Sequence, residues 1–310
     1  MLKPKILVAG SLNMDMIFET KVMPQQGQTV MGSLFRKAAG GKGANQAVQM
    51  ARLGAAVVML GKLGRDNMGK ELLDIISSEG VDTGRIVFDE MVSTGCAAIL
   101  LEKNDQGSAE NRIIVTPGAN MTLCSNDIAG VKKDIADFKM VVLQNEIPAA
   151  VNEEIAMAAK AEGVPVMLNP APSSHISEKL LKTLQYIAPN EHELYDLTGV
   201  RVREGDRLDE ESLRKAVVFL HKKGAENVIV TLGSAGAAIL YKNEYLYSPA
   251  VKGVKVVDPT GAGDSFIGAF CFSVCMGIEP GKAMEFANRT AAMTVTRHGA
   301  IPAMPFYNEM

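Results

Sequence analysis

The 310-residue chain has few cysteines, no excess of basic residues and no long apolar run. Four cysteines are too few for a disulfide scaffold. Its 32 Lys and Arg against 35 Asp and Glu give a net charge of −3, which disfavours nucleic-acid binding. The longest mostly apolar run, 266–277, is shorter than the about 20 residues that span a bilayer. Residues 1–10 lack the features of a signal peptide. We therefore expect a cytoplasmic globular protein with neither a nucleic-acid nor a membrane partner.

Common signatures of nucleotide binding and hydrolysis are also missing. No Gly-x-x-x-x-Gly-Lys-Ser/Thr sequence occurs, which excludes a P-loop, and no Gly-x-Gly pair is followed by the third glycine of a dinucleotide-binding loop. The four histidines are scattered, without metal-ligand spacing and without a Ser or Cys elbow beside them. A nicotinamide-dependent oxidoreductase is therefore disfavoured, and nothing indicates a zinc site or a catalytic triad.

The chain does contain a regular alternation of short apolar runs and amphipathic segments. The amphipathic segments are typical of helices, and Asp66 and Asp209 stand where they can cap two of them. Because the apolar runs are continuous, they favour strands buried on both faces of a parallel sheet: 6–9, 57–60, 140–143, 166–168 and 228–232. This pattern predicts a three-layer α/β/α fold in a single domain, 1–310.

Two segments break this alternation. Residues 14–36 and 94–117 each have the pattern of two strands around a turn, at 23–27 and 104–107. Four inserted strands can pair into a small sheet that must bury one face, either over an active site or against a partner. We expect a small β-sheet lid on the main body.

The segment VDPTGAGD, 257–264, combines a strand end, a glycine-rich turn and the start of an apolar helix. Gly261, Ala262 and Gly263 would present backbone N–H groups at the helix N-terminus, where anions bind. Asp264 would repel a phosphate there, but it could accept the proton of a hydroxyl that attacks one. The alternative is an Asp that only caps a buried helix.

Two further motifs indicate a site for a ligand with many hydroxyls. GSLNMD, 10–15, sets Asn13 and Asp15 after the first strand, where open α/β sheets bind ligands. Amide and carboxylate groups suit hydroxyls, which both donate and accept hydrogen bonds. AGGKGANQ, 39–46, is a glycine-rich loop that leads into a helix bearing Asn45. Alternatively, each motif only forms a backbone turn and binds no ligand.

Two other motifs can be explained by local structure alone. Asn190 to Glu193 forms N-x-x-E, which by itself is typical of a helix capping box. Thr231 to Gly236 follows a predicted strand as a polar turn that either lines a nucleotide or simply joins two strands.

Taken together, these strings resemble the ribokinase-like family of carbohydrate kinases, also called the PfkB family, from about Leu7 to about Pro302. GGKGANQA, 40–47, is similar to its N-terminal signature, and DPTGAGDSFIGAF, 258–270, to its C-terminal one. The ribokinase branch matches best. The other strings follow in the family's order: GSLNMD, STG (93–95), LQNEIP (143–148), NPAP (169–172), APNEHEL (188–194) and VTLGSAG (230–236).

The resemblance implies transfer of the γ-phosphoryl group of ATP, with Mg²⁺, to the 5-hydroxyl of D-ribose. Asp264 would be the base, and Gly261, Ala262 and Gly263 would form the anion hole. The sugar-binding positions of the family match Asn13, Asp15, Gly41, Lys42, Asn45, Glu146 and Asp264. The ATP-binding positions match Asn190, Glu193, Thr231, Gly233, Gly236, Gly263 and Asn288, with Asn190 and Glu193 organising Mg²⁺ and phosphates through water. The lid strands would cover the sugar and form a homodimer contact.

The resemblance also implies a K⁺ site beside the anion hole. Its carboxylate matches Asp258, and its backbone carbonyls match Thr260, Arg297 and Gly299. Ala303 stands where a serine is common, which predicts weaker activation by K⁺ if that hydroxyl helps to hold the cation.

Several alternatives to ribose phosphorylation remain at this stage. The acceptor could be deoxyribose, a ketose or a ribonucleoside, although the polar set Asn13, Asp15, Asn45 and Glu146 favours a small sugar. A non-catalytic sugar sensor on a kinase scaffold is the other alternative.

Overall fold

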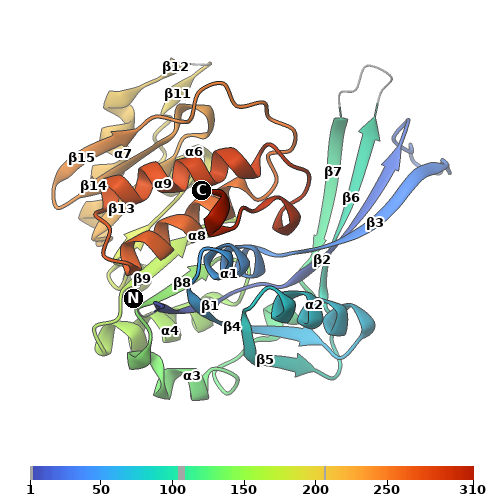
Figure 1. Ribbon diagram of the computed structural model, residues 1–310, viewed down its shortest axis with the longest axis horizontal. Coiled ribbons are helices and arrows are strands. Elements are labelled where there is room, and N and C mark those ends of the chain that lie inside the picture. The colour runs from blue at the N-terminus through green and yellow to red at the C-terminus, as the bar shows by residue number, and fades with distance from the viewer. Residues whose placement is uncertain (1–2, 104–108, 206) are drawn as a thin grey trace.

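The computed structural model describes residues 3–103, 109–205 and 207–310 (Figure 1). Among these residues, one large sheet has nine strands. In spatial order they are β15 (Glu244–Ser248), β14 (Ala237–Tyr241), β13 (Asn227–Thr231), β10 (Tyr186–Ile187), β9 (Val166–Asn169), β8 (Met140–Gln144), β1 (Lys5–Ala9), β4 (Ala56–Gly64) and β5 (Asp82–Asp89).

The large sheet is parallel from β13 to β5, and β14 and β15 add an antiparallel hairpin at one edge. The five apolar runs noted in the sequence lie in β1, β4, β8, β9 and β13, apart from a last residue just beyond β13. Because parallel strands end at one edge of a sheet, the loops after β1, β8, β9 and β13 gather there.

Helices cover both faces of this sheet. Ile6 and Val8 of β1 pack into one core cluster, while Leu7 and Ala9 pack into the other, as expected for a strand buried on both sides. The first face carries α1 (Lys42–Arg52), α2 (Asn67–Ser78), α8 (Ala262–Cys275) and α9 (Pro280–Thr294). The second carries α3 (Ala129–Lys133), α4 (Ala149–Ala161), α5 (Glu178–Leu181), α6 (Glu191–Thr198) and α7 (Glu210–Lys223). The three-layer α/β/α fold is confirmed.

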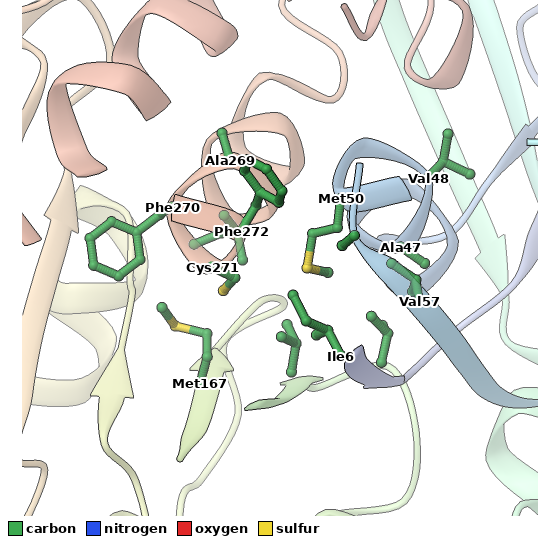
Figure 2. Close-up of a cluster of buried hydrophobic side chains, with 14 of the residues drawn as sticks. Ile6, Ala47, Val48, Met50, Val57, Met167, Ala269, Phe270, Cys271 and Phe272 are labelled. Carbon is green, nitrogen blue, oxygen red and sulfur yellow. The ribbon is translucent and has the colours of Figure 1, made fainter. Parts of the chain in front are cut away.

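Buried side chains join α1 and α8 above the middle of the sheet. Figure 2 shows Met50 of α1 and Cys271 of α8 beside Ile6 and Met167 of the strands below. Cys271 is fully buried within this apolar cluster. This packing places the first turns of the two helices side by side, and these turns carry most of the residues singled out in the sequence.

A second sheet, of four strands within the described residues, stands beside the main body (Figure 1). Its order is β3 (Gly32–Gly40), β2 (Asn13–Thr20), β6 (Gly95–Lys103) and β7 (Ala109–Thr116). These strands largely coincide with the two segments predicted as a lid, although β2 begins one residue before 14 and β3 extends to Gly40, beyond 36. We call this sheet the lid. The predicted turn at 104–107 lies outside the described residues. That the whole chain forms one domain remains a prediction.

The connections show why the lid matters for the site. β2 begins at Asn13, shortly after β1 ends at Ala9, and β3 ends at Gly40, directly before α1. Asn13 and Asp15 are therefore lid residues at the base of β2. A short hairpin that the sequence did not indicate, β11 (Arg203–Glu204) and β12 (Arg207–Leu208), forms a further small sheet. None of the described helices is long and apolar enough to cross a membrane.

Candidate active site

Asp264 lies in the first turn of α8, just after Gly261, whose left-handed backbone (φ 77°) starts the helix. The Asp264 side chain is only 8% exposed. Two amides of α1 donate to its carboxylate: Asn45 Nδ2 to Oδ2 at 2.8 Å and Gln46 Nε2 to Oδ1 at 2.9 Å. The alternative that Asp264 only caps the helix is wrong, because Gly261 is the N-cap and the Asp264 side chain is directed to the neighbouring helix.

The predicted anion hole is the N-terminus of α8. Ala262, Gly263 and Asp264 form its first residues, where backbone N–H groups point out of the helix. The Ala262 N–H donates to the Pro259 carbonyl at 3.2 Å. This N–H would have to leave that bond to contact a ligand, whereas Gly263 is exposed at the helix end.

Glu146 connects three parts of the predicted sugar site. It follows β8, and its Oε2 accepts the backbone N–H of Lys42 at 3.1 Å and the hydroxyl of Ser11. The carboxylate thus lies at the N-terminus of α1, where the helix dipole favours negative charge.

The ammonium group of Lys42 lies in the field of three carboxylates. Burial lowers the pKa of Lys42, but the charges of Asp264, Glu146 and Glu193 outweigh it and leave that pKa above its ordinary value. Lys42 is therefore a cation at neutral pH. It lies between residues predicted to bind the sugar and residues predicted to bind ATP.

Asp15 is a carboxylate whose pKa is raised at this site. Burial, and then the nearby charge of Glu146, raise the pKa of Asp15 to about 6. Gly40 lies directly against it, since a Cβ at Gly40 would be 2.7 Å from an Asp15 oxygen. The close approach of β3 to β2 thus depends on a residue without a side chain.

Asn13 has its amide oriented by a residue that the sequence reasoning missed. Asn120, in the 3-10 turn Gly118–Thr122, donates from Nδ2 to Asn13 Oδ1 at 2.8 Å and accepts the Leu12 N–H at 2.9 Å. Because the Asn13 oxygen is used in this way, its Nδ2 is the group left to meet a ligand. No sequence signal near Asn120 indicates this role.

Gly41 requires glycine for two reasons. Its φ of 92° is rare for other residues, and a Cβ there would lie 2.8 Å from both the Asn13 nitrogen and the Ser11 carbonyl. The glycine loop therefore brings the start of α1 against the β1–β2 connection. Polar residues from segments far apart in the sequence thus come together, and we call them the polar cluster: Asn13, Asp15, Lys42, Asn45, Glu146 and Asp264.

A cavity of about 1020 Å³ opens on the other side of the α8 N-terminus. Several residues of the predicted ATP set line it: Asn190, Thr231, Gly233, Gly236, Gly263 and Asn288. Ala262 lines it as well, so two of the three residues of the predicted anion hole face this cavity. The sequence reasoning missed the side chains of Tyr195, Arg201 and Arg203 and the apolar surface of Val251, Val254 and Val256.

Asn190 and Glu193 form a complete capping box at the start of α6. Glu193 Nα donates to Asn190 Oδ1, and the Asn190 N–H and Nδ2 donate to the Glu193 carboxylate, each at 2.9 Å. Burial raises the pKa of Glu193, and its carboxylate is 7% exposed. The capping interpretation is therefore correct as local structure, and it places a buried acidic group near Lys42 and Asp264.

The residues of the predicted K⁺ site come from two loops that Asp258 joins. Its Oδ1 accepts the Thr260 N–H and its Oδ2 accepts the Gly299 N–H, both at 2.9 Å. Burial alone would raise the pKa of Asp258, but these hydrogen bonds hold it below its ordinary value. Arg297 lies in the same loop as Gly299 and pairs with Glu309 at 2.6 Å. Ala303 is fully buried nearby in sequence.

The chain is similar to known carbohydrate kinases along nearly its whole length. The chain is 36% identical to a ribokinase of Haemophilus influenzae over 99% of this chain and 97% of that protein. It is 34% identical to a deoxyribokinase of Salmonella typhi over 98% and 97%. The solved structure of Arabidopsis thaliana ribokinase complexed with ribose and ATP superposes with a TM-score of 0.89 at 32% identity, covering 99% of this chain and 97% of that one.

The match to a family model is equally extensive, because the model described as pfkB family carbohydrate kinase covers residues 3–306. Fold, sequence identity and the order of the motifs lead to one conclusion. The chain belongs to the pfkB family of carbohydrate kinases.

Proposed function

We propose that this kinase transfers the γ-phosphoryl group of ATP to the 5-hydroxyl of D-ribose. The observation that carries the proposal is the position of Asp264. Its carboxylate bonds to Asn45 within the polar cluster, while the adjacent Gly263 lines the 1020 Å³ cavity. A hydroxyl on one side and a phosphate on the other would thus meet at the N-terminus of α8. Relatives named ribokinase and a ribokinase structure with ribose and ATP support the choice of substrates.

The polar cluster supplies the groups for a small sugar. Asn13 and Lys42 offer N–H donors, and Asp15, Glu146 and Asp264 offer acceptors. Gly41 and Asn45 complete the set, and the Asn45 oxygen is buried without a partner among the described residues. A buried acceptor left in this state costs free energy, so a sugar hydroxyl that donates to it would be favoured.

The cavity supplies the groups for ATP. Val251, Val254 and Val256 offer apolar surface for a base, while Asn190 and Thr231 add polar side chains and the glycines at 233 and 236 add backbone to the same lining. The described residues contain no group of three or more His, Cys, Asp or Glu arranged to hold a metal. This fits Mg²⁺ bound to ATP phosphates and reached through water by Asn190 and Glu193, since Mg²⁺ keeps several waters. Mg²⁺ would neutralise phosphate charge during transfer.

The chain's own residues then perform three tasks. Asp264 orients the acceptor hydroxyl and accepts its proton as the bond to phosphorus forms. The N–H groups of Gly261, Ala262 and Gly263 stabilise charge on the transferred group. The lid, whose base carries Asn13 and Asp15, covers the sugar and excludes water that would otherwise hydrolyse ATP.

Two features complete the proposal. K⁺ would bind at Asp258 with the carbonyls of Thr260, Arg297 and Gly299, where Asp258 already joins both loops. A homodimer would form through the lid, whose strands expose Phe35, Ile113 and Ile114. A second copy of the chain would cover these exposed apolar side chains.

Deoxyribose is the second candidate acceptor, because a relative of similar identity is named deoxyribokinase. The experiment is ADP release by the purified protein with Mg·ATP and K⁺, comparing D-ribose, deoxyribose, fructose and adenosine. Fast turnover with ribose and a 5-phosphate product by phosphorus NMR are expected. Preference for another acceptor would replace the substrate, and no turnover with any of them would favour the sugar-sensor alternative.

A further inference from the structure

Gln46 is a fully buried residue of α1 that contacts Asp264 and does not line the 1020 Å³ cavity. Its Nε2 donates to Asp264 Oδ1 at 2.9 Å and to Asn169 Oδ1 at 3.1 Å. Its Oε1 accepts from Gln144 Nε2 at 2.7 Å. Both amide hydrogens and the amide oxygen are therefore used, and each is used by a different residue.

The direction of the Gln46 amide is set by a backbone group. Asn169 Nδ2 donates to the Ala188 carbonyl at 3.0 Å. A carbonyl can only accept, so the Asn169 amide must present its oxygen to Gln46. Gln46 must in turn present its NH₂ group to Asn169 and to Asp264. The reverse orientation would leave three oxygens facing one another.

Close packing of α1 and α8 makes this contact possible. Gly268 of α8 lies so near α1 that a Cβ there would be 2.8 Å from Gln49 Cβ (Figure 2 shows the two helices side by side). At this separation a glutamine side chain of α1 reaches the first turn of α8. Gln46 meets Asp264, and Gln49 meets the adjacent Ser265 at 2.8 Å.

We propose that Gln46 is a positioning residue for phosphoryl transfer. Its amide holds the Asp264 carboxylate through Oδ1, so that Oδ2 stays on the side of Asn45 and the acceptor hydroxyl. Asn169 and Gln144 act through it by keeping the amide in one direction. This inference rests on the proposed function, because it assigns a purpose to the orientation of the base.

The test is the variant Gln46→Met, which keeps the length of the side chain and removes both donors. A misoriented base lowers kcat, and we expect a loss of about 10- to 100-fold. The KM for ribose and for ATP should stay within about twofold, because Gln46 is buried and contacts neither ligand. Gln46→Glu, which has the same shape and faces Asp264 with a charge, should lose at least as much kcat.

Gln49→Met is the matched control. Gln49 lies one turn further along α1, is equally buried, and bonds to Ser265 and to the Pro305 carbonyl at 3.1 Å. The Gln49→Met substitution should lower the Tm as much as Gln46→Met does, while its kcat stays within about twofold of the wild type. If Gln46→Met fails to fold, Gln144→Met removes the donor to Gln46 Oε1 and so holds the Gln46 amide less firmly, while every residue that contacts Asp264 stays unsubstituted. This variant should lower kcat at constant KM.

A double-mutant cycle separates positioning from general structure. In an Asp264→Asn background, Gln46→Met should cost little further kcat, because the carboxylate it orients is gone. The inference would be overturned if Gln46→Met lowered kcat by the same factor in both backgrounds. It would also be overturned if Gln46→Met lowered kcat no more than Gln49→Met does. A wild type that phosphorylates no sugar would overturn the proposed function and this inference with it, whereas an active wild type beside an equally active Gln46→Met would overturn the inference alone.

Discussion

The carboxylate of Asp66 accepts two hydrogen bonds from Thr94, one from its backbone N–H and one from its hydroxyl, both at 2.8 Å. The same carboxylate caps α2 by accepting the Gly69 N–H at 2.8 Å. Thr94 directly precedes β6 of the lid. The N-terminal end of α2, a helix of the main body, is therefore hydrogen-bonded to the base of the lid.

Asp66→Ala should loosen this tie. We expect the free energy of unfolding to fall by about 1–2 kcal/mol, because a helix cap and the bonds to Thr94 are lost together. The KM for the sugar should rise because the lid closes less well. Asp209→Ala is the control, since Asp209 caps α7 through Glu211 and Ser212 away from the lid. Urea unfolding and sugar kinetics of both variants check the prediction, and an equal rise in KM for both would contradict it.

Asp15→Asn should stabilise the fold while it weakens sugar binding. The pKa of Asp15 is raised from its ordinary value of 3.8 to about 6. The ionised carboxylate therefore costs stability above pH 6, and the cost disappears as the pH falls toward 3.8. At pH 8 the variant should gain about 1–3 kcal/mol in the free energy of unfolding, and below pH 4 most of the gain should vanish.

The wild-type KM for ribose should also rise as the pH falls through about 6, because protonated Asp15 loses acceptor capacity. Urea unfolding at both pH values and sugar kinetics across the range are the measurements. A stability difference that did not change with pH would count against the shifted pKa.

Asp264→Asn should lower kcat by about 10³-fold or more, since general bases contribute factors of this size and the base also orients the hydroxyl. The fold should be retained because the side chain keeps its size. Single-turnover phosphate transfer and thermal unfolding check both parts. A folded variant within about tenfold of the wild type would remove Asp264 from the role of base.

Activity should depend on K⁺, with full rates in K⁺ buffer and lower rates in buffer containing only Na⁺. Ala303→Ser should lower the K⁺ concentration needed for half activation, if a hydroxyl at that position helps to hold the cation. Initial rates across a K⁺ titration at constant ionic strength are the measurement. Equal rates in the two buffers would argue against the K⁺ site.

The lid should mediate a homodimer. Ile114 is 68% exposed on the lid and Met157 is 44% exposed on α4, far from it in the sequence. Ile114→Lys should weaken the dimer, because a charge replaces apolar contact area. Met157→Lys should leave it unchanged. Sedimentation velocity over a concentration series gives the readout, and a monomeric wild type would rule the interface out.

Local patterns determined much of this protein. Continuous apolar runs indicated the buried parallel strands because such strands are covered on both faces. Asp66 and Asp209 marked helix starts because the N-cap side chain accepts N–H groups of the first turn that follows it in the sequence. The motifs around Gly41 and Asp264 also indicated the site residues and, through resemblance, the family.

Only the tertiary structure decided how these residues act on one another. Asn120 orients Asn13 from 107 positions away, and Gln46 reaches Asp264 across 218. Their amides have no period or spacing that a sequence pattern could reveal. The pKa of Asp15 likewise depends on burial and on Glu146, which the fold brings near. The sequence determined which chemical groups the protein has and where its helices and strands form, whereas orientation and electrostatics arose only when distant segments packed together.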